Sequence, residues 1–422
     1  MKPTEFRLAT ELPHLADSVK TGWFNRLCVR ILARWLARME FGHLDLVLPD
    51  GQWIRVGNQD NPQVRAEVRL HSLRPLRRLL RGGQIGWAQG YMAGEWDSPD
   101  ISALILWALG NEANFGRLDQ GFALSAGLHR LSHLTRRNSR RGSRRNIAYH
   151  YDLGNDFYRL WLDPGMTYSS ALFADPQQSL EQAQQNKYRR ICDLLQLEPG
   201  QQVLEIGCGW GGFAETAARD YGSQVSGITL SQEQLAWSRE RIAKQGLESQ
   251  CSFSLTDYRD LDTRVDRIAS IEMFEAVGEE NWPEYFTQIK RSLKPGGLAL
   301  LQIISIEDDR FDGYRRSADF IQRYIFPGGM LPSRARLQQE ISHAGLELVQ
   351  QEQFGEDYAL TLTLWRDAFL QQWPQIEAQG FDERFKRMWL YYLGYCEGGF
   401  RHGAIDVGLY LIRAEQDATA AA

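Results

Sequence analysis

The sequence predicts an α/β fold in which a mostly parallel sheet carries helices on both faces. Two observations support this: apolar, strand-like runs alternate with helical segments from residue 202 onward, and a glycine-rich turn joins the first strand to the first helix. Parallel strands need such crossover helices, which then cover the sheet. Ser231 is the expected N-cap of the second helix. The expected strands lie at 202–206, 224–229, 252–256, 267–272 and 298–304, and the expected helices at 213–221, 232–245 and 283–293.

The length of the chain indicates a second domain before this region. The chain has 422 residues, and residues 1–135 show mainly helical spacing with short strand signals. From Trp23 to Trp35, apolar residues recur at helical spacing and alternate with arginines. This helix either packs on a core with a solvated arginine face or lies on an anionic membrane surface. Alternation from Leu44 to Val56 around an Asp-Gly pair predicts a hairpin.

A basic linker at 136–145 is expected between the two domains. Seven arginines fall within 130–145, and no acidic residue occurs between Asp119 and Asp152. Like charges at this density repel one another, so an anionic partner is expected. Phospholipid headgroups fit better than nucleic acid, because the aromatic side chains of a single-strand binder are absent here. The predicted domains are therefore an accessory, lipid- or membrane-associating domain at 1–135 and a larger α/β domain at 146–422.

The overall composition excludes several classes of protein. The net charge of -5 gives no global attraction to anionic partners. The five cysteines are scattered without metal-ligand spacing, which favours a reducing compartment and no metal site. No apolar stretch is long enough to span a membrane, and the first residues lack the apolar core of a signal peptide. We expect a cytoplasmic protein, peripherally associated with the inner face of the membrane.

The glycine-rich turn indicates a nucleotide site. Gly207, Gly209 and Gly212 also match the GxGxxG fingerprint of dinucleotide sites. Such a site needs an acidic residue after the second strand for the ribose, and that strand ends Gly-Ile-Thr-Leu instead. Glu205, in the first strand, provides a carboxylate suited to the sulfonium and amino group of S-adenosylmethionine (SAM). Asp257, just after the third strand, suits an adenine amine, so the pattern favours SAM.

These segments together resemble the cyclopropane fatty acid synthase family, which includes the mycolic acid cyclopropane synthases. The resemblance implies the class I SAM-methyltransferase fold, Rossmann-like with a mostly parallel seven-stranded sheet, and makes 146–422 the catalytic domain. It also implies a smaller, mainly helical N-terminal domain and suggests a homodimer. The matching stretches are 148–173 (AYHYDLGNDFYRLWLDPGMTYSSALF), 203–213 (VLEIGCGWGGF), 227–234 (GITLSQEQ), 274–285 (FEAVGEENWPEY), 323–333 (RYIFPGGMLPS), 354–362 (FGEDYALTL) and 389–401 (WLYYLGYCEGGFR).

The resemblance implies a reaction and a set of cofactor contacts. A methyl cation passes from SAM to a cis double bond of a phospholipid acyl chain, and a base then removes a proton from the added methyl to close a cyclopropane ring. The alkene needs a dry pocket and aromatic faces rather than a base for the attack itself. Candidate aromatic residues are Tyr324, Phe326, Tyr358, Trp365 and Tyr391. The implied SAM contacts come from Tyr168, Ser169, the loop with Gly207, Gly209 and Gly211, Thr229, Leu230, Gln234, Asp257 and Tyr258.

The base implied by the resemblance is a bicarbonate ion held by a cysteine, a glutamate, a histidine and a tyrosine. The glutamate falls on Glu275 and the tyrosine on Tyr358, whereas Ser170 replaces the cysteine and Gln302 the histidine. Serine and glutamine still donate hydrogen bonds to an anion, but the imidazole is lost. Two outcomes remain open: ring closure, or a methyl-branched or methylated unsaturated chain. Cys396 matches the family's C-terminal cysteine, a candidate catalytic thiol for which a buried structural role is the other interpretation.

Two further hypotheses remain from the sequence. Fold alone does not fix substrate, so a small-molecule methyltransferase is possible on the same scaffold. The other is a SAM- or lipid-binding module that has lost activity with the changes at Ser170 and Gln302. Retention of Glu275 and Tyr358 favours an enzyme over this module.

Overall fold

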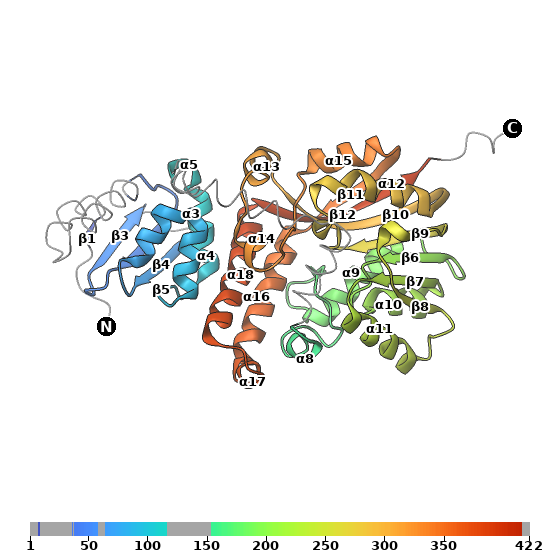
Figure 1. Ribbon diagram of the computed structural model, residues 1–422, viewed down its shortest axis with the longest axis horizontal. Helices are drawn as coiled ribbons and strands as arrows, with labels where there is room; N and C mark the ends of the chain where they lie inside the picture. Colours follow the sequence, from blue (N-terminus) through green and yellow to red (C-terminus); the bar gives the residue numbers. More distant parts are fainter. Residues whose placement is uncertain (1–6, 9–35, 37, 58–63, 116–152, 416–422) are drawn as a thin grey trace. The chain divides into compact units, whose positions relative to one another are not determined.

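The computed structural model describes residues 7–8, 36, 38–57, 64–115 and 153–415 (Figure 1). These residues form two compact units. Among them, the first unit contains the residues up to 115 together with 316–320 and 373–404, and the second contains the remainder. The sequence analysis expected contiguous domains, whereas the chain enters the first unit three times. The expected linker at 136–145, the helix from Trp23 to Trp35 and the arginine run lie outside the described residues.

The first unit contains a five-stranded sheet in the order β1-β3-β2-β4-β5. Strands β2 and β3 pair antiparallel and form the predicted hairpin. Gly51 turns the chain there with φ of +85°, a value that favours glycine, and its N–H donates to Leu48 at 2.9 Å. The strands are β1 (Arg7–Leu8), β2 (His43–Val47), β3 (Trp53–Gly57), β4 (Arg65–Leu70) and β5 (Trp96–Asp97).

Helices of the first unit pack closely through glycine. Helix α18 lies against α4, and a Cβ on Gly394 or Gly398 would stand 2.7 Å from Ile101 or Ile105. The two backbones can therefore approach only because both positions lack a side chain. The helices of this unit are α3 (Arg74–Met92), α4 (Ile101–Gly110), α5 (Glu112–Phe115), α17 (Trp373–Ala378) and α18 (Glu383–His402).

The second unit is built on a seven-stranded sheet in the order β11-β12-β10-β9-β6-β7-β8. Each neighbouring pair from β10 to β8 is parallel, and β12 runs antiparallel to both β10 and β11. The predicted mostly parallel sheet of seven strands is confirmed. The strands are β6 (Gln202–Ile206), β7 (Gln224–Thr229), β8 (Cys251–Leu255), β9 (Val265–Ile271), β10 (Leu293–Ile306), β11 (Leu346–Gln353) and β12 (Ile405–Ala414).

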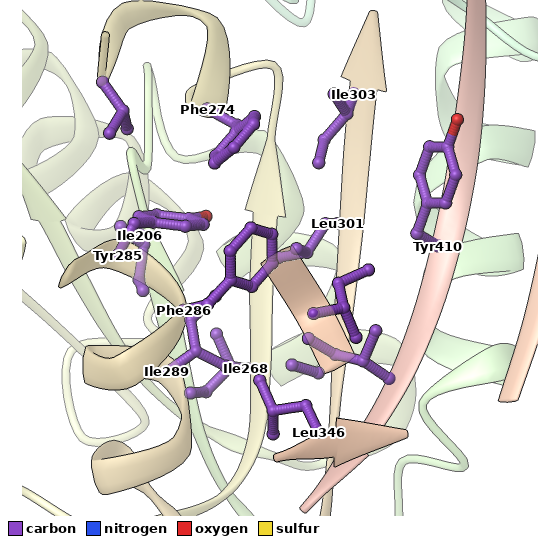
Figure 2. Packing of buried hydrophobic residues seen from close by; sticks show 14 of the residues in the cluster. Ile206, Ile268, Phe274, Tyr285, Phe286, Ile289, Leu301, Ile303, Leu346 and Tyr410 are labelled. Atoms are coloured by element: carbon purple, nitrogen blue, oxygen red, sulfur yellow. The ribbon is translucent and has the colours of Figure 1, made fainter. Parts of the chain in front are cut away.

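Helices cover both faces of this sheet because its strands are apolar on both sides. Leu301 and Ile303 face a core with α12 and α15, whereas Leu300 faces a core with α9 and α10. Figure 2 shows the first core, where Phe286 and Ile289 of α12 pack on Ile268 and Leu301. The α-helices of this unit are α8 (Asn155–Tyr158), α9 (Leu180–Leu194), α10 (Gly212–Tyr221), α11 (Gln232–Gln245), α12 (Trp282–Ser292), α13 (Asp308–Tyr314), α15 (Arg334–His343) and α16 (Gly355–Gln371); α14 (Phe320–Tyr324) straddles the two units, and short 3₁₀ helices are η3 (Tyr258–Asp260), η4 (Phe274–Ala276) and η5 (Glu279–Asn281).

The strand order predicts a ligand-binding crevice between β6 and β9. The chain adds β7 and then β8 on one side of β6, and afterwards adds β9 and β10 on the opposite side of β6. Ligands of open parallel sheets bind at such a reversal, beyond the carboxyl ends of the strands. The fourth predicted strand, expected at 267–272, ends one residue earlier at Ile271. Glu272 therefore lies beyond the strand, at the carboxyl edge.

The described residues contain no helix long and apolar enough to cross a bilayer.

Candidate functional site

A glycine loop forms the crevice wall after β6. Gly207, Gly209 and Gly211 have φ of +84°, +51° and +83°, in the region that favours glycine. The N–H groups of Gly207 and Cys208 donate to the carbonyl of Ile228 at 3.0 and 2.9 Å, which ties the loop to β7. Helix α10 begins directly after the loop, so its N-terminus faces the crevice.

Glu205 gives this crevice an unsatisfied acceptor. Its side chain is 2% exposed, and Oε2 has no hydrogen-bond partner among the described residues. Burial raises the pKa of Glu205 well above its usual range, opposed by the charges of Arg241 and Lys187. A buried orphan acceptor costs free energy unless a donor satisfies it. The amino group or a hydroxyl of SAM would supply that donor, so these residues fit the predicted cofactor.

Polar side chains that follow β7 and β8 lie at the same carboxyl edge of the sheet. Thr229 donates to Gln234 Oε1 at 2.8 Å, and both side chains are buried. The Asp257 carboxylate is held by Arg259, whose Nε and Nη2 donate to it at 2.9 and 2.7 Å. The sheet therefore brings the cofactor candidates from three neighbouring strand ends together, with Leu230 and Tyr258 beside them in sequence. That they contact SAM stays a prediction.

An aromatic cluster lies next to this edge. The ring of Tyr168 stands 5.3 Å from Tyr158, 5.6 Å from Trp161 and 5.2 Å from Trp365. The ring of Tyr358 follows at 6.1 Å from Trp365. Tyr158, Trp161 and Trp365 are at most 1% exposed. Such a cluster excludes water and presents ring faces that stabilise a cation.

A half-buried carboxylate, that of Glu272, lies at the end of the aromatic cluster. Its Oε1 accepts hydrogen bonds from the Ser170 N–H at 2.8 Å and from Gln302 Nε2 at 2.7 Å. Its Oε2 accepts one from the Tyr358 hydroxyl at 2.7 Å. Burial raises the pKa of Glu272, while these donors and Lys187 lower it. Three of the residues predicted from sequence are thus brought together, and the group that joins them was not predicted.

Glu275 lies one turn further along the chain. Its Oε1 accepts a hydrogen bond from the Ile304 N–H at 2.6 Å, and its Oε2 is buried without a partner among the described residues. Burial, with a contribution from the negative charge of Glu272, raises the pKa of Glu275 to about 8. Glu275 is therefore largely protonated at neutral pH.

A buried lysine lies among the acidic side chains of the site. Lys187 on α9 is fully buried, and its Nζ donates to Ser169 Oγ at 2.5 Å. Burial lowers its pKa to about 7, opposed by the charges of Glu272, Asp163 and Glu205. Lys187 therefore links the cofactor side, at Glu205, to the side of Glu272.

The chain was compared with known protein families. The model of the mycolic acid cyclopropane synthetase family matches residues 138–409, which is more than half of the chain. The chain belongs to this family.

The sequences of two relatives align with most of this chain. It is 39% identical over 346 residues to the tuberculostearic acid methyltransferase of Mycobacterium tuberculosis, an alignment that covers 78% of this chain and 79% of the relative. It is 37% identical over 380 residues to the cyclopropane-fatty-acyl-phospholipid synthase of Escherichia coli, with 87% of this chain and 94% of the relative aligned.

Solved structures agree with this assignment. The mycolic acid cyclopropane synthase CmaA1, complexed with SAH and CTAB, is 33% identical with a TM-score of 0.61, covering 64% of this chain and 98% of that one. Coclaurine N-methyltransferase, at 18% identity and a TM-score of 0.59, covers 78% of this chain and 98% of its own and shares the fold. This family member is a SAM-dependent methyltransferase of class I, with SAM as its cofactor, as predicted.

The remaining candidates fall in different places. Cys396 and Tyr391 lie on α18, which belongs to the first unit. A catalytic role for Cys396 stays a prediction. The sequence analysis missed Glu272, Lys187, Tyr158 and Trp161. The sequence analysis placed Glu272 at the end of the fourth strand, at 267–272, and gave it no role.

Replacing Glu275 by glutamine should flatten the pH dependence of stability. The folded-state pKa is raised from 4.5 to about 8, so the contribution of this group is full below pH 4.5 and is lost as pH rises toward 8. Glu275→Gln does not titrate. Between pH 5 and pH 8 the wild type should therefore lose roughly 3 kcal/mol of unfolding free energy that Glu275→Gln keeps. Urea denaturation at both pH values measures this.

The control for this measurement is Glu347→Gln, because Glu347 is exposed and forms a 3.5 Å ion pair with Arg413. Its stability should follow the wild type at both pH values. Parallel curves for Glu275→Gln and the wild type would contradict the assignment of a raised pKa.

Proposed function

We propose that this enzyme transfers the methyl group of SAM to the double bond of unsaturated fatty-acyl chains of phospholipids, as a cyclopropane-fatty-acyl-phospholipid synthase does. The observation that carries the proposal is the continuity of the site. The glycine loop after β6, where we place the cofactor, contacts the aromatic cluster through Trp210, whose ring centroid lies 5.3 Å from that of Tyr158, and the cluster ends at the hydrogen-bonded carboxylate of Glu272.

This arrangement suits an alkene substrate. An alkene is a weak, neutral nucleophile, so methyl transfer depends on orientation and on exclusion of water. The positive charge that develops on the chain can be stabilised by the rings of Tyr168, Trp365 and Tyr358. A polar substrate would need buried hydrogen-bonding groups where these rings lie, so the cluster argues against a small polar methyl acceptor.

The phospholipid substrate class is supported by the relatives. The Escherichia coli relative, aligned over 94% of its length, is a cyclopropane-fatty-acyl-phospholipid synthase. The arginine run at 130–145 is consistent with an anionic membrane surface, where each arginine contributes about 1 kcal/mol. We propose accordingly that the enzyme acts while peripherally bound at the cytoplasmic face, without nucleic acid and as a homodimer.

Turnover on vesicles tests the proposal. The purified enzyme is incubated with SAM that carries a trideuterated methyl group and with vesicles of dioleoyl phosphatidylglycerol, and the acyl chains are analysed by mass spectrometry. We expect a chain lengthened by one methylene that keeps two of the three deuterium atoms, with a cyclopropane ring by nuclear magnetic resonance. Absence of any methylated chain would refute the proposed function. A product that keeps all three deuterium atoms would refute ring closure.

Saturated phosphatidylglycerol vesicles provide the matched control, because they present the same surface charge without a double bond. No chain should be methylated in them.

A further inference from the structure

Glu272 adopts a backbone conformation that glycine normally occupies. Its φ is +47°, one of three positive values among non-glycine residues in the described chain. A residue with a side chain held in this region costs of order 1 kcal/mol or more and persists where the surroundings over-determine it. The Glu272 N–H donates to the Gln302 carbonyl at 2.8 Å, which fixes this turn beside β10. The turn directs the carboxylate toward its three donors.

Those three donors include the groups expected to hold a bicarbonate ion. Ser170 and Gln302 stand at the positions of the family's cysteine and histidine, and Tyr358 at that of its tyrosine. In the structure the backbone N–H of Ser170 and the side chains of Gln302 and Tyr358 donate to Glu272, whereas the Ser170 hydroxyl donates to the carbonyl of Ala171 at 3.0 Å. Two neighbouring groups are buried without partners among the described residues: Gln302 Oε1 is an acceptor, and Glu275, when protonated, offers a single O–H donor.

A bicarbonate ion therefore does not fit this site. It would need hydrogen-bond donors that Glu272 already uses. It would also bring a second negative charge beside the Glu272 carboxylate, which is strongly unfavourable in a dry site. The chain therefore has serine at 170 and glutamine at 302 together with a carboxylate of its own, that of Glu272.

We propose that the Glu272 carboxylate takes the place of bicarbonate and is the base that removes a proton from the newly added methyl group. This rests on the proposed function, because it names the group that completes the same reaction. Ser170, Gln302 and Tyr358 are then positioning residues for Glu272 rather than ligands of an exchangeable ion.

The step balances without any co-reactant. The methyl carbon bonds to one alkene carbon as its bond to the sulfonium sulfur breaks, which leaves a carbocation at the other alkene carbon. A C–H bond of the added methyl then breaks, its electron pair closes the ring, and the proton goes to Glu272. An ionised carboxylate has about four acceptor positions. Ser170 and Gln302 fill two of them at Oε1 and Tyr358 fills one at Oε2, so Oε2 keeps a position for the proton.

The surroundings favour this role. Burial raises the pKa of Glu272, which makes its carboxylate a stronger base than an exposed one. Lys187 opposes the shift and keeps the ionised form accessible. The protonated neighbour Glu275 adds no competing charge at neutral pH.

Two variants test the proposal by turnover on the dioleoyl phosphatidylglycerol vesicles. Glu272→Gln keeps the shape but removes the base, so kcat should fall at least about 100-fold and added bicarbonate should not restore it. Glu272→Gly removes the side chain, relieves the positive φ and leaves the three donors for an anion. Its activity should be low in bicarbonate-free buffer and rise at least about tenfold with bicarbonate. Wild-type turnover should not respond to bicarbonate, and SAM affinity by calorimetry verifies folding of each variant.

A binding measurement tests, independently of turnover, whether Glu272 takes the place of bicarbonate. Nuclear magnetic resonance with ¹³C-bicarbonate should show binding to Glu272→Gly and none to the wild type. Bound bicarbonate in the wild type, bicarbonate-dependent wild-type turnover, or a Glu272→Gln kcat within about threefold of the wild type would each overturn the proposal. Absence of turnover by the wild type would refute the proposed function instead, and the binding arm would still decide whether Glu272 excludes the ion.

Discussion

Substituting valine for Gly211 should abolish SAM binding at ordinary concentrations. Gly211 has φ of +83°, and a Cβ there would stand 3.0 Å from Cβ and 3.4 Å from Cα of Ser238 on α11. A β-branched residue suffers strain from the backbone and from this contact at once, so the loop before α10 must move. We expect the dissociation constant for SAM to rise at least about 100-fold, equivalent to roughly 3 kcal/mol. Isothermal titration calorimetry measures it.

Gly246→Val is the matched control for this substitution. Gly246 also has a positive φ, of +67°, at the C-terminus of α11, but a Cβ there meets nothing within 4 Å. It should lose stability to the same kind of backbone strain while keeping its affinity for SAM. Equal affinity in Gly211→Val and the wild type would show that the loop does not form the cofactor site.

Truncating Trp365 to alanine should destabilise the second unit by about 3–5 kcal/mol. Trp365 is fully buried, and its ring contacts those of Trp161 at 5.7 Å and Tyr168 at 5.2 Å. Removal of the indole leaves a cavity in the middle of the aromatic cluster, which then admits water. Methyl transfer should therefore fall together with stability. Urea denaturation and turnover on unsaturated vesicles measure the two effects.

Trp237→Ala tests whether this loss is specific to the cluster. Trp237 is a half-buried tryptophan on α11, and its loss should cost no more than about 1 kcal/mol. Trp365→Phe should recover part of both stability and turnover, because it keeps an aromatic face. A Trp365→Ala enzyme as stable as Trp237→Ala would contradict the packing described here.

Much of the second unit follows from local pattern. The strands at 202–206 and 224–229 and the helix at 232–245 with its Ser231 cap occur with the predicted bounds. In these segments the apolar residues follow a clear strand or helix pattern, and glycine turns and a serine cap mark their ends. The glycine loop could be predicted as a SAM site because its strand–turn–helix context is local in the sequence.

The centre of the site could not be predicted in the same way. Glu272 reads as the last residue of a strand, because one residue's difference in a strand end has no local signal. Its importance comes from Ser170 and Tyr358, which lie 102 and 86 residues away and meet it only in the fold. Lys187 likewise reads as a polar residue of an amphipathic helix, until the fold buries it beside Glu205.

The place of β12 has a consequence for how this chain is made. The strand lies between β10 and β11, yet it follows them in sequence, after α18 has contributed to the other unit. While the chain is being synthesised, β10 and β11 must therefore wait for residues 405–414 with unpaired edges. Parallel and non-local sheets fold slowly and expose such edges to aggregation. The sheet is complete only once residues 405–414 have been synthesised, so a chain that stops before them would expose an unpaired, aggregation-prone β-edge.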